Sequence, residues 1–149
     1  ELIFDQGLGD LFTIRVAGNV LGSAQVASIE YAVRDLGAKL IVVLGHESCG
    51  AVKAAIESKG KPSYGNGESP DMNWLVSSIR PALKARGLAS ISPDDPKLRK
   101  PVMANIDSVT DNLVVRSKVV SDAIAKGKLK VVRGIYSLES GKEDFWGEK

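Results

Sequence analysis

The sequence predicts an α/β fold, with a mainly parallel β-sheet flanked by helices. Two observations support this prediction. Short runs of β-type residues alternate with stretches whose apolar residues recur every three or four positions, as in amphipathic helices. The run at residues 40–44 is aliphatic throughout, which is typical of a strand buried on both faces of a parallel sheet. We see no internal repeat, and we expect residues 1–149 to form a single domain.

The first part of the chain predicts two strands and two helices. Residues 11–16 carry Phe, Thr, Ile and Val in an alternating pattern, which indicates a short strand. Ser23 is expected to cap a helix, because apolar residues spaced three or four apart follow it and Gly37 then ends the pattern. The aliphatic run at 40–44 predicts the second strand. A helix is expected over residues 51–58 after a glycine-flanked turn.

The second part predicts helices and a closing strand. Residues 59–71 are rich in Gly, Pro, Ser and Asn and predict a loop, after which Ser69 is expected to cap a helix. Pro81 is expected to kink or end that helix. A strand is expected to begin at residues 129–133. Between them, one long helix is predicted from a stripe of apolar residues on one face: Val102, Ile106, Val109, Leu113, Val120 and Ile124.

Composition narrows the class of protein. A hydrophobic fraction of 44% and a charged fraction of 26% are ordinary for a globular domain. The net charge of +2 arises from scattered Lys and Arg, so we expect no nucleic-acid partner. No apolar run approaches the roughly 20 residues that span a membrane. The single cysteine excludes an internal disulfide, which fits a reducing compartment, and we expect a cytoplasmic protein.

One histidine and one cysteine carry the most informative chemistry. His46 and Cys49 are the only residues of their types in the sequence, and they lie on the predicted turn after the strand at 40–44. Ligands in open α/β sheets bind at this end of the strands. Thiolate sulfur and neutral imidazole nitrogen are preferred zinc ligands, and the start of the next helix favours a negative charge on Cys49. The pair therefore predicts half of a zinc site.

The same turn has three other interpretations. A buried structural cysteine beside a histidine bonded to backbone explains the pair without a metal. Gly45 and Gly50 have the spacing of a phosphate-binding loop, but Ala51 and Val52 replace the required Lys and Ser or Thr. A Cys–His nucleophilic pair is a further alternative. Zinc is favoured once the rest of the sequence is considered.

Several blocks along the chain follow one family's pattern in order. They are residues 3–12 (IFDQGLGDLF), 15–19 (RVAGN), 30–33 (EYAV), the Gly45-His46-x-x-Cys49-Gly50 turn, 134–136 (GIY) and the Ser140-Gly141 turn. On these blocks the chain resembles the β-class carbonic anhydrases, zinc enzymes that interconvert carbon dioxide and bicarbonate. The resemblance implies that fold, zinc as cofactor, and a homo-oligomer with the dimer as minimal unit.

The resemblance also implies a zinc site that is shared with another segment. His46 and Cys49 correspond to two of the family's three constant zinc ligands. The third is a cysteine in a Cys-x-Asp-x-Arg segment, which in the family shortly precedes the stretch matched by the start of this chain. No such segment occurs in the sequence, so we expect the domain to be N-terminally incomplete. The inner first strand of the sheet would be absent with it, leaving a gap between 11–16 and 40–44.

Further roles follow from the resemblance. Arg15 and Tyr136 match positions that, in some family members, line an inhibitory bicarbonate pocket. Small apolar residues would border the carbon dioxide pocket: Val16, Ala17, Gly18 and Gly50. Two other functions remain open from the sequence. One is a non-catalytic relative that keeps the fold as a binding module, and the other is a hydrolase of carbonyl sulfide or carbon disulfide on the same scaffold.

Overall fold

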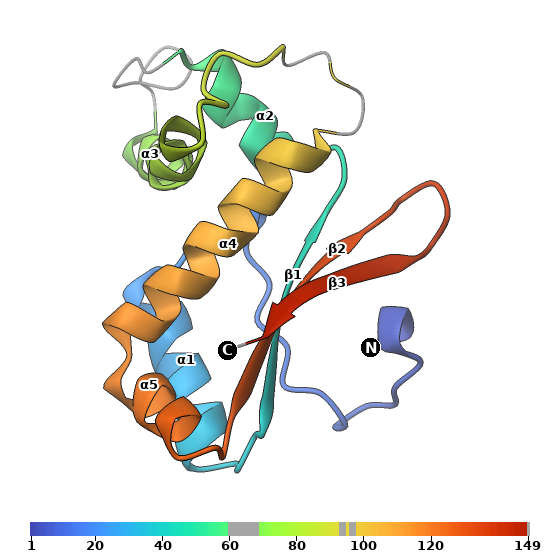
Figure 1. Cartoon of the computed structure of the whole chain (residues 1–149), viewed down its shortest axis with the longest axis vertical. Coiled ribbons are helices and arrows are strands. Elements are labelled where there is room, and N and C mark those ends of the chain that lie inside the picture. The colour runs from blue at the N-terminus through green and yellow to red at the C-terminus, as the bar shows by residue number, and fades with distance from the viewer. Residues whose placement is uncertain (60–68, 93–94, 96–97, 149) are drawn as a thin grey trace.

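The computed structural model describes residues 1–59, 69–92, 95 and 98–148. Its helices cover one side of a small sheet (Figure 1). The α-helices are α1 (Ser23–Arg34), α2 (Gly50–Glu57), α3 (Pro70–Ala85), α4 (Arg99–Arg116) and α5 (Lys118–Ala125). Two 3-10 turns span Leu2–Phe4 and Ala17–Asn19, and the strands are β1 (Leu40–His46), β2 (Lys130–Tyr136) and β3 (Glu143–Glu148). None of the described helices is both long enough and apolar enough to cross a membrane.

The sheet has the order β1-β2-β3. β1 pairs with β2 in parallel, with His46 opposite Tyr136, and β3 returns antiparallel to β2 with an irregularity at Val132/Arg133. The predicted α/β class is confirmed, and over the described residues the sheet is mixed. β1 is an edge strand in this part of the chain, so its outer N–H and C=O groups face no described strand.

Helix α4 packs across the face of the sheet and forms the centre of the core. Ile106 of α4 is 0% exposed, as are Val131 and Ile135 of β2. Gly45 of β1 lies so close to α4 that a Cβ there would be 2.7 Å from Ile106 Cδ1. This close approach fixes how the end of β1 is placed against the helix.

The expected long helix is two helices, which corrects the prediction of one continuous stripe. α4 ends at Arg116, and Ser117 adopts an extended conformation (φ −107°, ψ 108°) before α5 begins. The hydroxyl of Ser117 accepts a hydrogen bond from Val120 N at 3.1 Å and donates one to Glu30 at 2.7 Å. A serine that can cap a new helix and also bond to a neighbouring one stabilises a break that the apolar spacing does not reveal.

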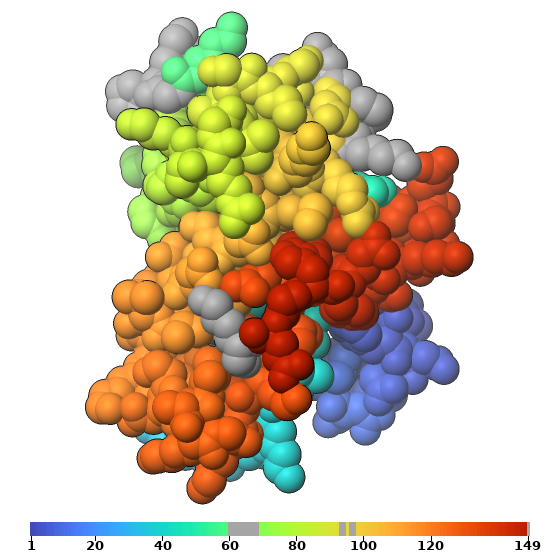
Figure 2. Space-filling model, in the orientation of Figure 1, coloured from blue at the N-terminus to red at the C-terminus, as the bar shows by residue number. Residues whose placement is uncertain are grey.

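The predicted strand at residues 11–16 is wrong. These residues form no regular element, and no strand in the described part of the chain pairs with them. A strand needs a partner for its backbone groups, and alternation of side chains cannot supply one. The chain before residue 16 lies on the side of the sheet away from α4 and forms a separate surface lobe beside the β2–β3 hairpin (Figures 1 and 2). Phe4 stacks there on Phe145 of β3, with ring centroids 6.5 Å apart.

Three helix-end predictions had different outcomes. Ser69 caps α3 as expected, accepting a hydrogen bond from Met72 N at 3.2 Å. Gly22, and not Ser23, is the N-cap of α1, because the side chain of Gln25 accepts the Gly22 N–H at 3.1 Å and fixes the first turn. Pro81 does not end α3: the buried neighbours Ile79, Ala82 and Leu83 keep the helix packed through to Ala85. The loop expected at 59–71 lies mostly outside the described residues.

Candidate metal centre

The candidate ligands lie on the short connection between β1 and α2. β1 ends at His46 and α2 begins at Gly50, so Cys49 is the N-cap of α2. The cysteine is 7% exposed, and its carbonyl accepts a hydrogen bond from Lys53 N at 3.0 Å. The positive end of the α2 dipole therefore lies at Cys49, where it favours a negative charge.

His46 is held in one orientation by its own backbone. Its ring atom Nδ1 lies 2.8 Å from the carbonyl oxygen of Glu47. A carbonyl can only accept, so this contact requires the proton on Nδ1 and leaves the lone pair of the neutral ring on Nε2. Metal-binding histidines are commonly oriented in this way by a hydrogen bond from the other ring nitrogen.

Both candidate ligands line a large cavity. Its volume is about 1880 Å³, and it is bounded by residues of the N-terminal arm and by β1 from Leu40 to His46. The structure places all eight residues predicted from the sequence around this one cavity: Arg15, Val16, Ala17, Gly18, His46, Cys49, Gly50 and Tyr136. Their roles stay predictions, but their proximity to one hollow beside β1 is a structural fact.

One predicted pocket residue, Gly18, is also explained by packing. Gly18 has φ +64°, and a Cβ on it would be 2.6 Å from Ile79 Cδ1, so the backbone and the space both require glycine. Asn105 donates to Gly18 O at 2.7 Å, and Asn19 donates to Leu44 O at 2.8 Å. These two amides were missed from the sequence. They join the Ala17–Asn19 turn to α4 and to β1, and so shape the cavity wall.

The two predicted bicarbonate residues lie in different surroundings. Arg15 is exposed and forms an ion pair with Glu1 at 3.2 Å. Asp10 accepts a hydrogen bond from Gly7 N at 2.9 Å within a turn. Tyr136 ends β2 opposite His46, and its carbonyl accepts a hydrogen bond from Glu47 N at 3.0 Å. The backbone of Tyr136 thus supports the candidate metal loop.

A charged group beside the loop was not predicted from the sequence. Glu47 is 6% exposed, and Arg99 Nη1 of α4 donates to its Oε1 at 3.1 Å. The other arm of Arg99 bonds to Asp144 of β3, and this hydrogen bond is the main reason why the pKa of Arg99 is raised. The sequence held one signal: a base in the first turn of a helix opposes the helix dipole, so it needs another reason to be there.

The donor types fit zinc, but the donor count does not reach a full site. In the described part of the chain, no three His, Cys, Asp or Glu side chains are grouped so that they could hold a metal ion. Zinc sites use three or four protein ligands, of which His46 and Cys49 would supply two.

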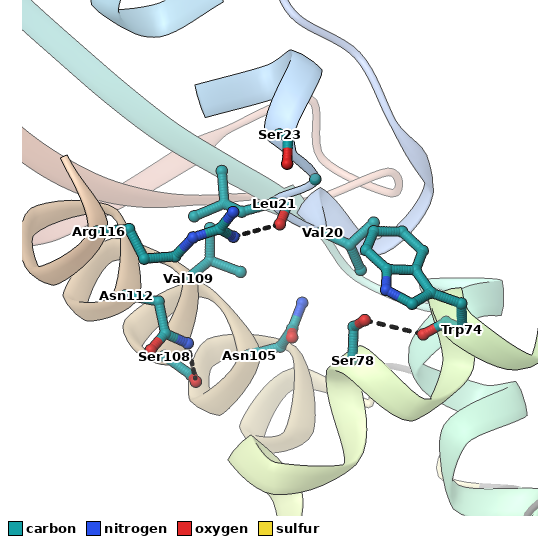
Figure 3. A pocket seen from close by; sticks show the side chains of 11 residues that line it. Val20, Leu21, Ser23, Trp74, Ser78, Asn105, Ser108, Val109, Asn112 and Arg116 are labelled. Atoms are coloured by element: carbon teal, nitrogen blue, oxygen red, sulfur yellow. Dashed lines mark hydrogen bonds between the residues drawn. The ribbon is translucent and has the colours of Figure 1, made fainter. Parts of the chain in front are cut away.

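A smaller pocket of about 460 Å³ lies between the start of α1, α3 and α4. Figure 3 shows its polar groups bonded to neighbours: Ser78 to Trp74 O, Asn112 to Ser108, and Arg116 to Leu21 O. It contains none of the residues predicted to form the site.

Comparison with known proteins decides the family. The sequence profile of the carbonic anhydrase family matches residues 1–143. This chain belongs to the β-class carbonic anhydrase family. A carbonic anhydrase 2 of Mycobacterium tuberculosis is 38% identical over 145 residues, which cover 95% of this chain and 65% of that protein. The Mycolicibacterium smegmatis carbonic anhydrase is 36% identical, with 97% and 67% covered.

Solved structures of the family share the fold. The Coccomyxa β-carbonic anhydrase superposes with a TM-score of 0.81 at 26% identity, covering 99% of this chain and 66% of that one. The β-carbonic anhydrase CcaA gives a TM-score of 0.83 at 25% identity, covering 97% and 66%. The present chain therefore spans about two thirds of the length of these family members.

Proposed function

We propose that the protein in its complete form is a zinc enzyme that reversibly hydrates carbon dioxide to bicarbonate. The observation that carries the proposal is the β1–α2 connection. It brings the only histidine and the only cysteine of the sequence to the wall of one cavity, with the histidine Nε2 left available. These are the donor types that zinc prefers.

Each nearby group then has a task. His46 and Cys49 would hold the ion, and the start of α2 favours the negative charge of the thiolate. Bound zinc supplies a water whose pKa is lowered towards about 7, which makes hydroxide available at neutral pH. Val16 and Ala17 give the cavity wall an apolar part that suits carbon dioxide. The sequence has no second histidine, so the released proton would pass through water.

We further propose that the third ligand comes from outside these 149 residues, along the free edge of β1. A cavity of about 1880 Å³ is far larger than carbon dioxide requires and exceeds the roughly 300–1,000 Å³ of ordinary ligand pockets. The unpaired backbone of β1 favours a strand as its occupant. The Cys-x-Asp-x-Arg segment expected from the family resemblance would supply both that strand and a second sulfur.

A second candidate is favoured by the donor count. On their own, these 149 residues would act as a non-catalytic module, because the described residues bring together fewer than three metal-ligating side chains.

Both candidate functions are compatible with assembly into a homo-oligomer. We propose a homodimer as the minimal unit, since Leu2, Leu8 and Phe12 of the N-terminal arm are exposed apolar side chains. A single domain and a cytoplasmic location stay predictions.

The test compares two chains. One is the chain of residues 1–149, and the other is the same chain extended by whatever its own gene encodes before Glu1. Zinc content and stopped-flow hydration of carbon dioxide are measured on both, with sulfide release from carbonyl sulfide as the competing activity. The proposal predicts about one zinc per chain and rapid hydration in the extended chain only, and loss of both in its Cys49→Ser variant. Its Lys53→Ala variant, changed on the exposed face of α2, should behave as wild type. An extended chain without zinc would contradict the enzyme and favour the non-catalytic module.

A further inference from the structure

Glu47 holds the candidate metal loop, residues 46–49, in place through hydrogen bonds. It directly follows β1 and makes three bonds to different partners. Its N–H donates to Tyr136 O at 3.0 Å, its carbonyl oxygen lies 2.8 Å from His46 Nδ1, and its carboxylate accepts from Arg99. The position of the Glu47 peptide therefore decides where the His46 ring points.

Arg99 reaches this loop because the first turns of α4 pack against the end of β1. Val102 and Ile106 pack against Gly45, each within 3.1 Å of where a Cβ on that glycine would stand. Arg99 lies one turn before Val102 on the same face of α4, and Glu47 lies two residues beyond Gly45. One helical turn rises 5.4 Å and two extended residues span about 6.5 Å, so the arginine arrives level with the carboxylate.

Without the ion pair between Glu47 and Arg99, the loop would be expected to change conformation. Ser48 has φ +57°, a left-handed conformation that is strained for a residue other than glycine. Glu47 is nearly fully buried as well, and a buried carboxylate is costly without a positive partner. Among the described residues, the ion pair with Arg99 is the one that Glu47 makes. Asp144 in turn holds the guanidinium from the β3 side.

We propose that Arg99 is a positioning residue for the candidate metal ligands: through the Glu47 carboxylate it holds residues 46–49 in their ligand-presenting form before any metal binds. That this form serves zinc rests on the proposed function, whereas the ordering of the loop does not. Arg99 is not assigned a catalytic role, since it acts on the site only through Glu47.

The test uses the two unique residues of the chain of residues 1–149 as reporters, in metal-free protein containing a chelator. The sequence has one histidine, so the ¹⁵N spectrum of its imidazole reports the tautomer of His46 alone. It is recorded at about pH 8.5, well above the ordinary imidazole pKa of about 6.5. The sequence also has one cysteine, so the rate of reaction with a disulfide reagent reports how often buried Cys49 opens to solvent.

The variants are Arg99→Gln, Arg99→Lys and, as a matched control, Arg86→Gln. Arg86 forms an ion pair of 2.7 Å with Asp107, so Arg86→Gln removes an arginine and an ion pair elsewhere, whereas Arg99→Gln removes the pairs with Glu47 and Asp144. In Arg99→Gln we expect the imidazole to lose its preference for the Nδ1–H tautomer and Cys49 to react about tenfold faster, as loss of a charge-assisted hydrogen bond allows. Arg99→Lys can keep one of the two carboxylate contacts, so its changes should be intermediate. Arg86→Gln should match wild type in both readouts.

Three results would overturn the proposal. The first is an Arg99→Gln protein that is folded, by circular dichroism, and has the wild-type tautomer and Cys49 rate. The second is the same change in Arg86→Gln as in Arg99→Gln, which would mean a general loosening. If Arg99→Gln does not fold, Glu47→Gln decides, because it removes the charge that Arg99 pairs with and keeps the backbone bonds of Glu47, and wild-type values in it are the third. Absence of zinc from the extended chain would contradict the proposed enzyme without affecting these readouts.

Discussion

Strand β1 has β2 hydrogen-bonded along one edge and a cavity of about 1880 Å³ along the other. On the paired side, Ile106 and Ile135 are 0% exposed, and the loop after the strand is bonded to both β2 and α4. On the cavity side lies the N-terminal arm, where Leu8 is 99% exposed and residues 11–16 pair with no described strand.

The difference shows which part of the metal centre these residues determine. The two candidate ligands and the groups that support them are held by contacts on the paired side. The cavity side has apolar side chains and unpaired backbone, which are features of a surface that another segment covers. The half with His46 and Cys49 should therefore be stable and well ordered, while the other half should tolerate substitution.

The largest contrast in stability is expected between one core residue and one arm residue. Ile106→Ala should lower the free energy of unfolding by about 2–5 kcal/mol, because it leaves a cavity between α4 and the sheet. Leu8→Ala should change it by less than about 0.5 kcal/mol, because that side chain is exposed. Urea denaturation of both variants measures the difference. A similar loss for both would mean that the arm is as closely packed as the core.

A smaller effect is expected from two glycines that flank the loop. Gly45→Ala should cost about 1–3 kcal/mol, since its Cβ would meet Ile106 at 2.7 Å and push β1 away from α4. Gly50→Ala is the matched control, because no atom lies within 4 Å of a Cβ there. The same denaturation experiment applies. Equal stability of Gly45→Ala and wild type would show that α4 does not fix the end of β1.

The sequence predicted the paired side better than the cavity side, for physical reasons. The strand at 40–44 and the turn with His46 and Cys49 follow from local patterns, namely a continuous aliphatic run and a glycine-flanked connection. The alternation at 11–16 was equally clear, yet a strand depends on a partner that its own residues do not specify. The Arg99–Glu47 pair joins residues 52 positions apart, and the basic residue in the first turn of α4 is a local signal for Arg99 that does not name its partner.

The smallest expected effect on stability is that of a surface charge on α5, which lies on neither the paired edge nor the cavity edge of β1. A hydrogen bond from the exposed Lys118 of α5 lowers the pKa of Asp122 below its ordinary 3.8. A carboxyl with a lowered pKa in the folded protein stabilises it above the ordinary pKa, and this contribution is lost as the pH falls through the lowered value. Asp122→Asn should therefore slightly flatten the loss of stability below about pH 4 and change little at neutral pH. Denaturation midpoints from about pH 2 to 7 would show it, and a large change at pH 7 would contradict it.

The most direct test of the central claim, that the metal centre is completed from outside these 149 residues, counts the sulfur atoms bound to zinc. X-ray absorption at the zinc edge is measured on the protein with whatever its gene encodes before Glu1. These 149 residues contain one cysteine, so we predict two sulfurs at about 2.3 Å, one of them from Cys49 and the other from the added segment, and a single sulfur in Cys49→Ser if zinc is still retained. Zinc bound by one sulfur and one imidazole with waters, or a protein that holds no zinc, would contradict the claim.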